Sequence, residues 1–299
     1  MNLCRFPEFE SIQPGHKDIF KKYLSLYKKE SCGFMFANVF SWKEILKLSV
    51  SSLDENLIIA GIHDNNPFFY EPVGDRKLLE SVKAVFRHFK NGNGKIHLKG
   101  ATEDFIKNVI NGDRSFSITE NRDDSEYIYL TADLISLKGN KYHSKKNLYN
   151  QFKKNNSYRY IKLEQDTAEH CIDFLDKWCE RKECGLTPLQ AKENCAAKRM
   201  LENFDYLELK GTAFEVNGVL SGLTLGEELN PDTFVVHVEK ATSLVKGLYQ
   251  AINREFLENE ASGYKYVNRE EDDGVAGLRK AKMSYNPVKL LKKYDIFSE

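Results

Sequence analysis

The spacing of hydrophobic and polar positions predicts helices followed by a meander in the second half of the chain. A helix is predicted over residues 166–182, where apolar side chains recur at i, i+3, i+4 and i+7: Cys171, Phe174, Leu175 and Trp178. A second helix is predicted over residues 190–205. Over residues 207–226, apolar and β-branched runs flank Asn217-Gly218, a pair that favours a tight hairpin. With a strand at 234–238, this region forms a three-strand antiparallel meander.

After the meander, the pattern indicates helix, strand, helix and strand. Apolar residues four apart predict a helix over 244–259, and a short strand follows at 264–267. Acidic residues open a helix that ends near 282, and an extended stretch covers 288–297.

The first half repeats this order of elements. The predicted helices are 16–29, 76–90 and 101–110, and the predicted strands are 42–50, 57–62, 68–73, 95–98 and an extended or hairpin stretch at 116–130. A meander followed by helix, strand, helix and strand is the plan of the GNAT acyltransferase fold. We therefore predict a mixed α+β protein of two GNAT-like domains, 1–135 and 161–299, joined by a basic connecting helix, 136–160. In this fold the fourth and fifth strands splay apart and leave a slot, which we place in the C-terminal domain.

Composition narrows the environment and the chemistry. The 299 residues carry 44 basic and 44 acidic side chains, so the chain as a whole has no attraction to nucleic acid or anionic membrane. No signal peptide and no apolar run of membrane-spanning length is present, which predicts a cytoplasmic protein. The six cysteines are scattered, and no C-x-x-C pair occurs. We therefore expect reduced thiols and no metal site.

A basic segment lies between the two halves. Residues 138–162 contain eight lysines and arginines, no acid and five aromatic residues. This composition suits a polyanion, with phosphates on the ammonium groups and bases stacked on the rings. The lysines predicted to form this patch are Lys141, Lys145, Lys146, Lys153 and Lys154. Alternatively, the segment is a solvated helix whose Tyr142, Tyr149 and Phe152 face a domain.

Three stretches, 34–42, 137–152 and 268–287, resemble a little-characterised bacterial family. That family shares its fold with the C-terminal domain of phosphatidylglycerol lysyltransferases and, more remotely, with Fem-type peptidyltransferases. The resemblance implies transfer of an aminoacyl group from tRNA to an amine or hydroxyl acceptor, such as a phospholipid headgroup or a peptide. No flippase portion is present, so delivery to a lipid would occur from the cytosol.

The same resemblance suggests which residues bind the substrates. Lys246, Gly247 and Asn253 occupy the place where GNAT proteins bind the phosphates of a donor, and Arg279 and Lys282 follow one helix after an acidic run. The acceptor side comprises Asn268, Arg269, Glu270 and Asp272, at the carboxyl end of the fifth strand, where open sheets bind ligands. We expect no tightly bound cofactor, with aminoacyl-tRNA or acyl-CoA as co-substrate. The expected partners are tRNA and phospholipid at a membrane surface.

Three polar side chains are candidates for the chemistry of acyl transfer. His237 and Glu239 alternate with valines on the fourth strand, which predicts that they share one face of the sheet. Glu239 is the candidate base or amine binder, and Tyr285 is the candidate general acid. A hydrogen-bonded, partly buried His237 and a packing Tyr285 are the alternatives. No P-loop, dinucleotide fingerprint, H-E-x-x-H or G-x-S-x-G motif is present.

Two further functions remain open from the sequence. The first is a catalytically silent module that binds tRNA, an anionic lipid headgroup or a protein. The second is acetyl transfer from acyl-CoA, which the sequence disfavours because only Gly247 stands where acetyl-CoA enzymes carry a glycine-rich loop.

Overall fold

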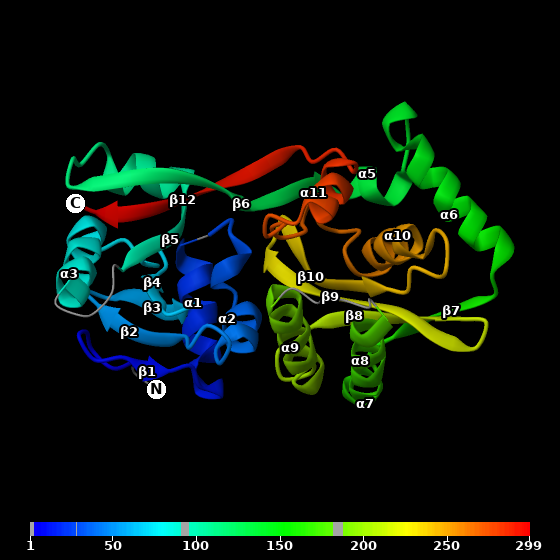
Figure 1. Cartoon of the computed structure of the whole chain (residues 1–299), viewed down its shortest axis with the longest axis horizontal. Coiled ribbons are helices and arrows are strands. Elements are labelled where there is room, and N and C mark those ends of the chain that lie inside the picture. Colours follow the sequence, from blue (N-terminus) through cyan, green and yellow to red (C-terminus); the bar gives the residue numbers. More distant parts are fainter. Residues whose placement is uncertain (1–2, 28, 91–95, 182–187) are drawn as a thin grey trace. The chain divides into compact units, whose positions relative to one another are not determined.

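A computed structural model describes residues 3–27, 29–90, 96–181 and 188–299 (Figure 1). Its contacts divide the chain into two compact units. The first unit contains residues 1–126, 271–276 and 290–299, and the second contains 127–270 and 277–289. The domain boundaries predicted at 135 and 161 remain a prediction.

The sheet of the first unit has the strand order β1-β2-β3-β4-β5-β12-β6. Its strands are β1 (Glu10–Ser11), β2 (Ser49–Leu53), β3 (Asn56–His63), β4 (Asn66–Phe69), β5 (His97–Thr102), β6 (Phe116–Leu130) and β12 (Lys289–Ser298). β1 to β4 pair antiparallel in succession, β4 and β5 are parallel, and β12 runs antiparallel to β5.

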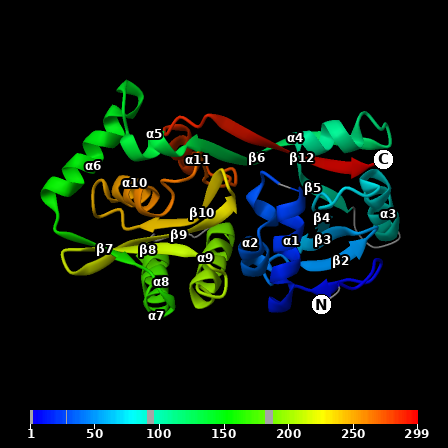
Figure 2. The same ribbon diagram turned by 180° about the vertical axis from the view of Figure 1, so that it is seen from behind.

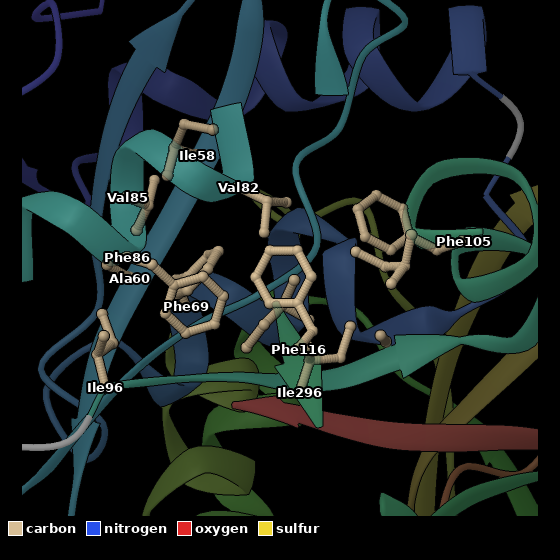
Figure 3. Packing of buried hydrophobic residues seen from close by; sticks show 13 residues of the cluster. Ile58, Ala60, Phe69, Val82, Val85, Phe86, Ile96, Phe105, Phe116 and Ile296 are labelled. Carbon is tan, nitrogen blue, oxygen red and sulfur yellow. The ribbon is translucent and has the colours of Figure 1, made fainter. Parts of the chain in front are cut away.

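The core of the first unit forms where α3 packs on this sheet. The helices are α1 (Lys17–Tyr27), α2 (Phe36–Trp42), α3 (Leu78–Lys90) and α4 (Glu103–Phe105), which continues as a π-helical turn (Ile106–Ile110). Phe86 of α3 meets Phe69 of β4 edge-on, with ring centroids 5.1 Å apart, and lies 5.5 Å from Phe116 of β6. Figure 3 shows these rings gathered with Val82, Val85 and Ile296. The predicted amphipathic helix over 76–90 is confirmed.

Several elements of the first half differ from the sequence prediction. Residues 42–50 were predicted as a strand, but α2 ends at Trp42 and β2 begins only at Ser49. Between them the chain forms a turn, in which the Leu46 N–H donates to the Trp42 carbonyl at 2.9 Å and the Leu48 N–H to the Lys43 carbonyl at 2.7 Å. β4 ends at Phe69 rather than 73, whereas β6 is one 15-residue strand, the extended alternative predicted for 116–130. β5 extends to Thr102, so the helix predicted to begin at residue 101 begins two residues later, at Glu103.

The sheet of the second unit has the strand order β6-β11-β10-β9-β8-β7. Its further strands are β7 (Tyr158–Lys162), β8 (Lys210–Val216), β9 (Val219–Asn230), β10 (Thr233–Ala241) and β11 (Tyr266–Asn268). β10 and β11 are parallel and the other pairs are antiparallel. The predicted hairpin is confirmed, because Asn217 and Gly218 form its turn with φ of 50° and 80°. The antiparallel meander and the flanking helices confirm the predicted mixed fold class.

Helices cover both faces of the second sheet. They are α5 (Thr131–Ser136), α6 (His143–Asn155), α7 (Gln165–His170), α8 (Ile172–Arg181), α9 (Pro188–Glu202), α10 (Leu248–Glu260) and α11 (Ala276–Met283). Figures 1 and 2 show α10 on one face of β8–β10 and α7–α9 on the other. Phe256 of α10 packs on Phe234 of β10 at 5.8 Å, and from the opposite face Trp178 of α8 donates to the Ala241 carbonyl at 2.8 Å.

Each unit is completed by a strand from the other half of the sequence. β12, at the end of the chain, pairs with β5 of the first unit through residues such as Ile296 and Leu98. The last residues of β6 pair with β11 of the second unit, with Tyr129 opposite Val267. The sequence analysis did not anticipate this exchange.

Candidate functional site

In the second unit, β10 and β11 part after a short parallel ladder. Only three pairs join them, and the last is Val235 with Asn268. β10 then continues to Ala241, whereas the chain beyond β11 turns to β6. Arg269 donates its backbone N–H to the Tyr127 carbonyl at 3.0 Å, and Tyr127 donates to the Glu270 carbonyl at 3.1 Å. A gap therefore opens between the second half of β10 and residues 269–270.

Charged side chains span this gap. Glu239 of β10 accepts a hydrogen bond from Arg269 at 3.0 Å, and one step earlier His237 contacts Glu270 at 2.7 Å. The side chains of Arg269 and Glu239 are 10% and 13% exposed, so their pairing takes place largely out of water. The gap is thus polar, as a site for acyl transfer requires.

Arg269 is held in place but keeps one free donor. Its Nη2 binds Glu239, and its guanidinium lies 5.0 Å from the ring centroid of Tyr285 and 5.7 Å from that of Tyr129. Its Nη1 is buried without a hydrogen-bond partner. Burial lowers the pKa of Arg269, but the Glu239 charge outweighs this and raises it, so the side chain is always cationic.

Asn253 of α10 leaves a free acceptor on the other side of Glu239. Its Nδ2 donates to Oε2 of Glu239 at 3.1 Å, whereas its own Oδ1 is buried without a partner. Glu239 is therefore flanked by an unpaired donor on Arg269 and an unpaired acceptor on Asn253. Because buried polar atoms are nearly always hydrogen-bonded, this arrangement suits a ligand or water that carries both an acceptor and a donor.

Tyr285 lies beside this site, with its ring against Arg269 and its hydroxyl hydrogen-bonded to Gln250. It is buried, and burial raises its pKa to about 12 even though Arg269 acts in the opposite direction. Its backbone carbonyl accepts a bond from Tyr142 at 3.1 Å, which fixes the segment after α11. At neutral pH the phenol therefore stays protonated and can act as an acid.

His237 sits between two carboxylates. Its ring nitrogens lie 2.7 Å from Glu270 and 3.1 Å from Glu227 of β9. Burial lowers the pKa of His237, but the two carboxylates outweigh it and raise the pKa to about 10. The imidazole is therefore charged at neutral pH and cannot serve as a base there. This environment matches the hydrogen-bonded histidine that the sequence left as an alternative.

A β-bulge changes the relation between His237 and Glu239. The register of β10 on β9 shifts between Val236 and Val238, so His237 is the extra residue. A bulge breaks the strict alternation on which the predicted common face depended. Glu239 binds Asn253 of α10, whereas His237 binds Glu227 of β9. Glu227 carries no local sequence signal that would have identified it.

The residues predicted to bind the donor fall in different surroundings. Gly247 precedes α10 with a φ of 85°, and a Cβ there would overlap the Leu148 carbonyl of α6. This close approach accounts for the glycine. Lys246 is exposed at the start of α10, and Arg279 is partly buried on α11. Lys282 donates to the Arg269 carbonyl at 2.6 Å and so supports the wall of the gap.

The predicted acceptor residues divide between the two units. Asn268 is buried and accepts a bond from the Glu270 N–H at 2.8 Å, so it shapes the turn that carries Arg269 and Glu270. Asp272 belongs to the first unit, where it pairs with Arg122 at 3.4 Å and caps Gly274. Asp272 therefore has a structural role of its own in that unit.

The basic connecting segment forms a 3₁₀ turn (Asn140–Tyr142), α6 and the strand β7, so only part of it is the predicted helix. Tyr142, Tyr149 and Phe152 are buried, as the alternative interpretation expected. Lys141 pairs with Asp133 at 3.0 Å, and Lys145 lies over the Tyr285 ring. The remaining predicted patch lysines are exposed: Lys146, Lys153 and Lys154.

The corresponding gap of the first unit is closed by paired groups. β4 and β5 share two residue pairs and then part, and Glu71 fills the space beyond them. Its carboxylate accepts bonds from the Thr102 N–H at 2.8 Å, the Thr102 hydroxyl at 2.9 Å and Lys29 at 2.6 Å. A cavity of about 330 Å³ occurs elsewhere in this unit and is lined by His63, Asp64, Asn66, His97, Lys99 and Phe297. Its Lys99 is already paired with Asp124.

The described residues show neither a metal cluster nor a membrane span. No three histidine, cysteine, aspartate or glutamate side chains among them are grouped to hold a metal ion. Cys4, Cys32, Cys171 and Cys195 form no disulfide within the described part of the chain, and Cys184 and the side chain of Cys179 lie outside that part. No helix in that part has the length and hydrophobicity needed to cross a bilayer.

A family model described as "phosphatidylglycerol lysyltransferase, C-terminal" matches residues 24–297. The chain belongs to this family. A conserved protein of unknown function from Bacteroides thetaiotaomicron shares 31% identity over 97% of this chain and 99% of its own, with a TM-score of 0.91. The expected family resemblance is thereby confirmed.

More distant solved structures share the fold of this family member. L-PGS from Bacillus licheniformis is 13% identical, with 100% of this chain and 94% of that chain covered and a TM-score of 0.65. A tandem GNAT protein from the clavulanic acid biosynthesis pathway is 9% identical, with 97% and 98% covered and a TM-score of 0.52. No curated protein matches the sequence. The predicted tandem GNAT-like architecture is confirmed.

Proposed function

We propose that the protein is an aminoacyltransferase whose site is the gap between β10 and residues 269–270. It moves an aminoacyl group from aminoacyl-tRNA to an amine or hydroxyl acceptor, such as a phospholipid headgroup or a peptide. The observation that carries the proposal is the pair of unpartnered buried atoms beside Glu239, Nη1 of Arg269 and Oδ1 of Asn253.

These two atoms favour an aminoacyl group over an acetyl group. An aminoacyl ester has a carbonyl oxygen that accepts from Arg269 and an α-ammonium that donates to Asn253 and Glu239. An acetyl group has no such donor, so Asn253 Oδ1 would stay buried and unpaired, at a cost of about 1–3 kcal/mol. The start of α10 also argues against acyl-CoA, because α6 lies against the single glycine there.

The proposed reaction is a direct transfer without a covalent enzyme intermediate. The acceptor nitrogen or oxygen attacks the ester carbonyl, and Arg269 stabilises the oxyanion that develops. Glu239 takes the proton that the acceptor loses. The bond from the carbonyl carbon to the ribose oxygen then breaks, and Tyr285 protonates that oxygen; a proton returned from Glu239 through solvent restores the phenol. The balance is one ester consumed, one amide or ester formed and one free tRNA released.

A catalytically silent binding module is the second candidate. The ion pairs Glu239–Arg269 and His237–Glu270 already span the gap, so a substrate has to share or displace these contacts. In such a module the pairs are purely structural and the fold serves recognition.

A transfer assay separates these candidates. Total tRNA charged with radiolabelled amino acids is incubated with the protein and with phosphatidylglycerol vesicles or an amine-bearing peptide. We expect label in one acceptor, and loss of that transfer in Glu239→Gln but not in the control Glu215→Gln, whose half-buried carboxylate pairs with the exposed Arg159 on β7. Binding of tRNA with no transfer to either acceptor supports the silent module. Transfer from acetyl-CoA alone supports an acetyltransferase.

A further inference from the structure

Two cations of the second unit meet at one aromatic ring. Lys145 of α6 places Nζ 4.5 Å from the ring centroid of Tyr285, and the guanidinium of Arg269 lies 5.0 Å from the same centroid. Lys145 is partly buried, and its burial together with the charge of Arg269 lowers its pKa. The two positive charges are therefore near enough to repel each other.

The charges at this position do not balance. Arg269 is neutralised by Glu239 through Nη2, and its buried Nη1 has no partner. Within the described residues, no carboxylate pairs with Lys145, whose only interaction is with the Tyr285 ring. An anion beside Lys145 would supply the missing countercharge, and Nη1 of Arg269 is left for the ester carbonyl.

The surroundings of Lys145 indicate what kind of anion this is. α6 has no acidic residue and also presents Lys146, Lys153 and Lys154 to solvent, so it offers a row of positive charge to a chain of phosphates. A lipid headgroup carries one phosphate of the same chemistry, but a row of lysines suits a polymer.

We infer that Lys145, beside Arg269, forms a subsite for the last phosphodiester of the donor RNA, which joins its 3′-terminal nucleotide to the preceding one. This inference rests on the proposed function, because it supplies the contact that would bring the aminoacyl ester to Glu239. It assigns α6 the role of guiding the RNA end, and Lys145 the role of a positioning residue.

Binding of uncharged RNA tests the subsite without any transfer step. Fluorescence anisotropy is measured with a labelled acceptor-stem minihelix that ends in CCA and with one that ends in CC and so lacks the last phosphodiester. The variants are Lys145→Ala and Lys145→Arg. Lys265→Ala is the matched control, because Lys265 is an exposed lysine of the same unit whose ammonium also lies over a tyrosine ring, 5.0 Å from that of Tyr266.

We expect Lys145→Ala to weaken binding of the CCA minihelix about tenfold, as for loss of one charge-assisted contact. It should reduce the slope of log K against log salt concentration by about 1. Binding of the CC minihelix should change little, Lys145→Arg should retain most of the affinity, and Lys265→Ala should behave as wild type.

Other results would overturn the inference. If Lys145→Ala loses the same affinity for both minihelices, Lys145 contacts another part of the RNA than the last phosphodiester. If it loses no more affinity than Lys265→Ala, Lys145 does not contact the RNA. Lys145-dependent binding of phosphatidylglycerol vesicles without RNA binding would assign the phosphate to a lipid. If transfer is observed but Lys145→Ala binds the RNA as tightly as wild type, only the subsite is contradicted. RNA binding that depends on Lys145, with no transfer to any acceptor, contradicts only the aminoacyltransferase.

Discussion

Glu239 and Arg269 join two strands that have already parted, through a 3.0 Å hydrogen-bonded ion pair in the interior of the second unit. Removing one partner of such a pair leaves the other buried and uncompensated. We expect Glu239→Ala to lower the free energy of unfolding by about 3–5 kcal/mol in urea titrations. Glu215→Ala, which breaks a pair with the exposed Arg159, should cost no more than about 1 kcal/mol. Equal costs for the two variants would show that Glu239 is not buried as described.

His237 should make the stability of the protein depend on alkaline pH. Its pKa is raised from an ordinary value of 6.5 to about 10 in the folded state. The stabilisation is therefore fully present below about pH 6.5 and is lost as the pH rises through about 10. Between pH 7 and 9.5 the unfolding free energy of the wild type should fall by up to about 1.4 kcal/mol per pH unit relative to His237→Gln. Parallel pH profiles for the two proteins would contradict the raised pKa.

Tyr285→Phe should separate catalysis from folding. The substitution keeps the ring that Arg269 and Lys145 contact but removes the acidic proton. If the protein is a transferase, the rate of transfer should fall by about 10²–10⁴-fold while RNA affinity and melting temperature stay unchanged. Tyr264→Phe is the control, because the pKa of Tyr264 is also raised to about 12, but its hydroxyl binds Glu228, away from Arg269. Equal rates for Tyr285→Phe and wild type would exclude the phenol as the acid.

Gly247→Ala should destabilise the second unit for two independent reasons. The residue has a φ of 85°, and an added Cβ would overlap the Leu148 carbonyl. We expect a loss of about 1–3 kcal/mol in thermal or urea unfolding, measured against Gly263→Ala. Gly263 has open space around the position of a Cβ, so its substitution should be nearly neutral. A neutral Gly247→Ala would mean that α6 does not approach α10 this closely.

Local signals in the sequence predicted much of the second unit. Asn217-Gly218 defines its hairpin without help from distant residues, and the four-residue spacing of Leu248, Ile252 and Phe256 defines α10. The run at 42–50 was assigned wrongly, because a short apolar segment does not distinguish a strand from the turn that here links α2 to β2.

The arrangement of the site depends on long-range pairing, which no local pattern records. The bulge at His237 arises from the register of β10 on β9, and it decides which partners His237 and Glu239 reach. Arg269 and Glu239 were each candidates, but their ion pair joins residues 30 apart in sequence. Lys145 was assigned only to a surface patch, because its place over Tyr285 depends on how α6 packs.

The position of β12 also determines when the protein can finish folding during synthesis. Ile296 and Lys293 belong to β12, which lies between β5 and β6 in the first unit's sheet, although most of that unit is made from the first 126 residues. When the N-terminal half has been translated, the strand between β5 and β6 is still missing. The unpaired edges of β5 and β6 are then exposed to solvent and to chaperones. The first unit closes only after β12 has been translated, so deletion of β12 would damage the part of the protein that was made first.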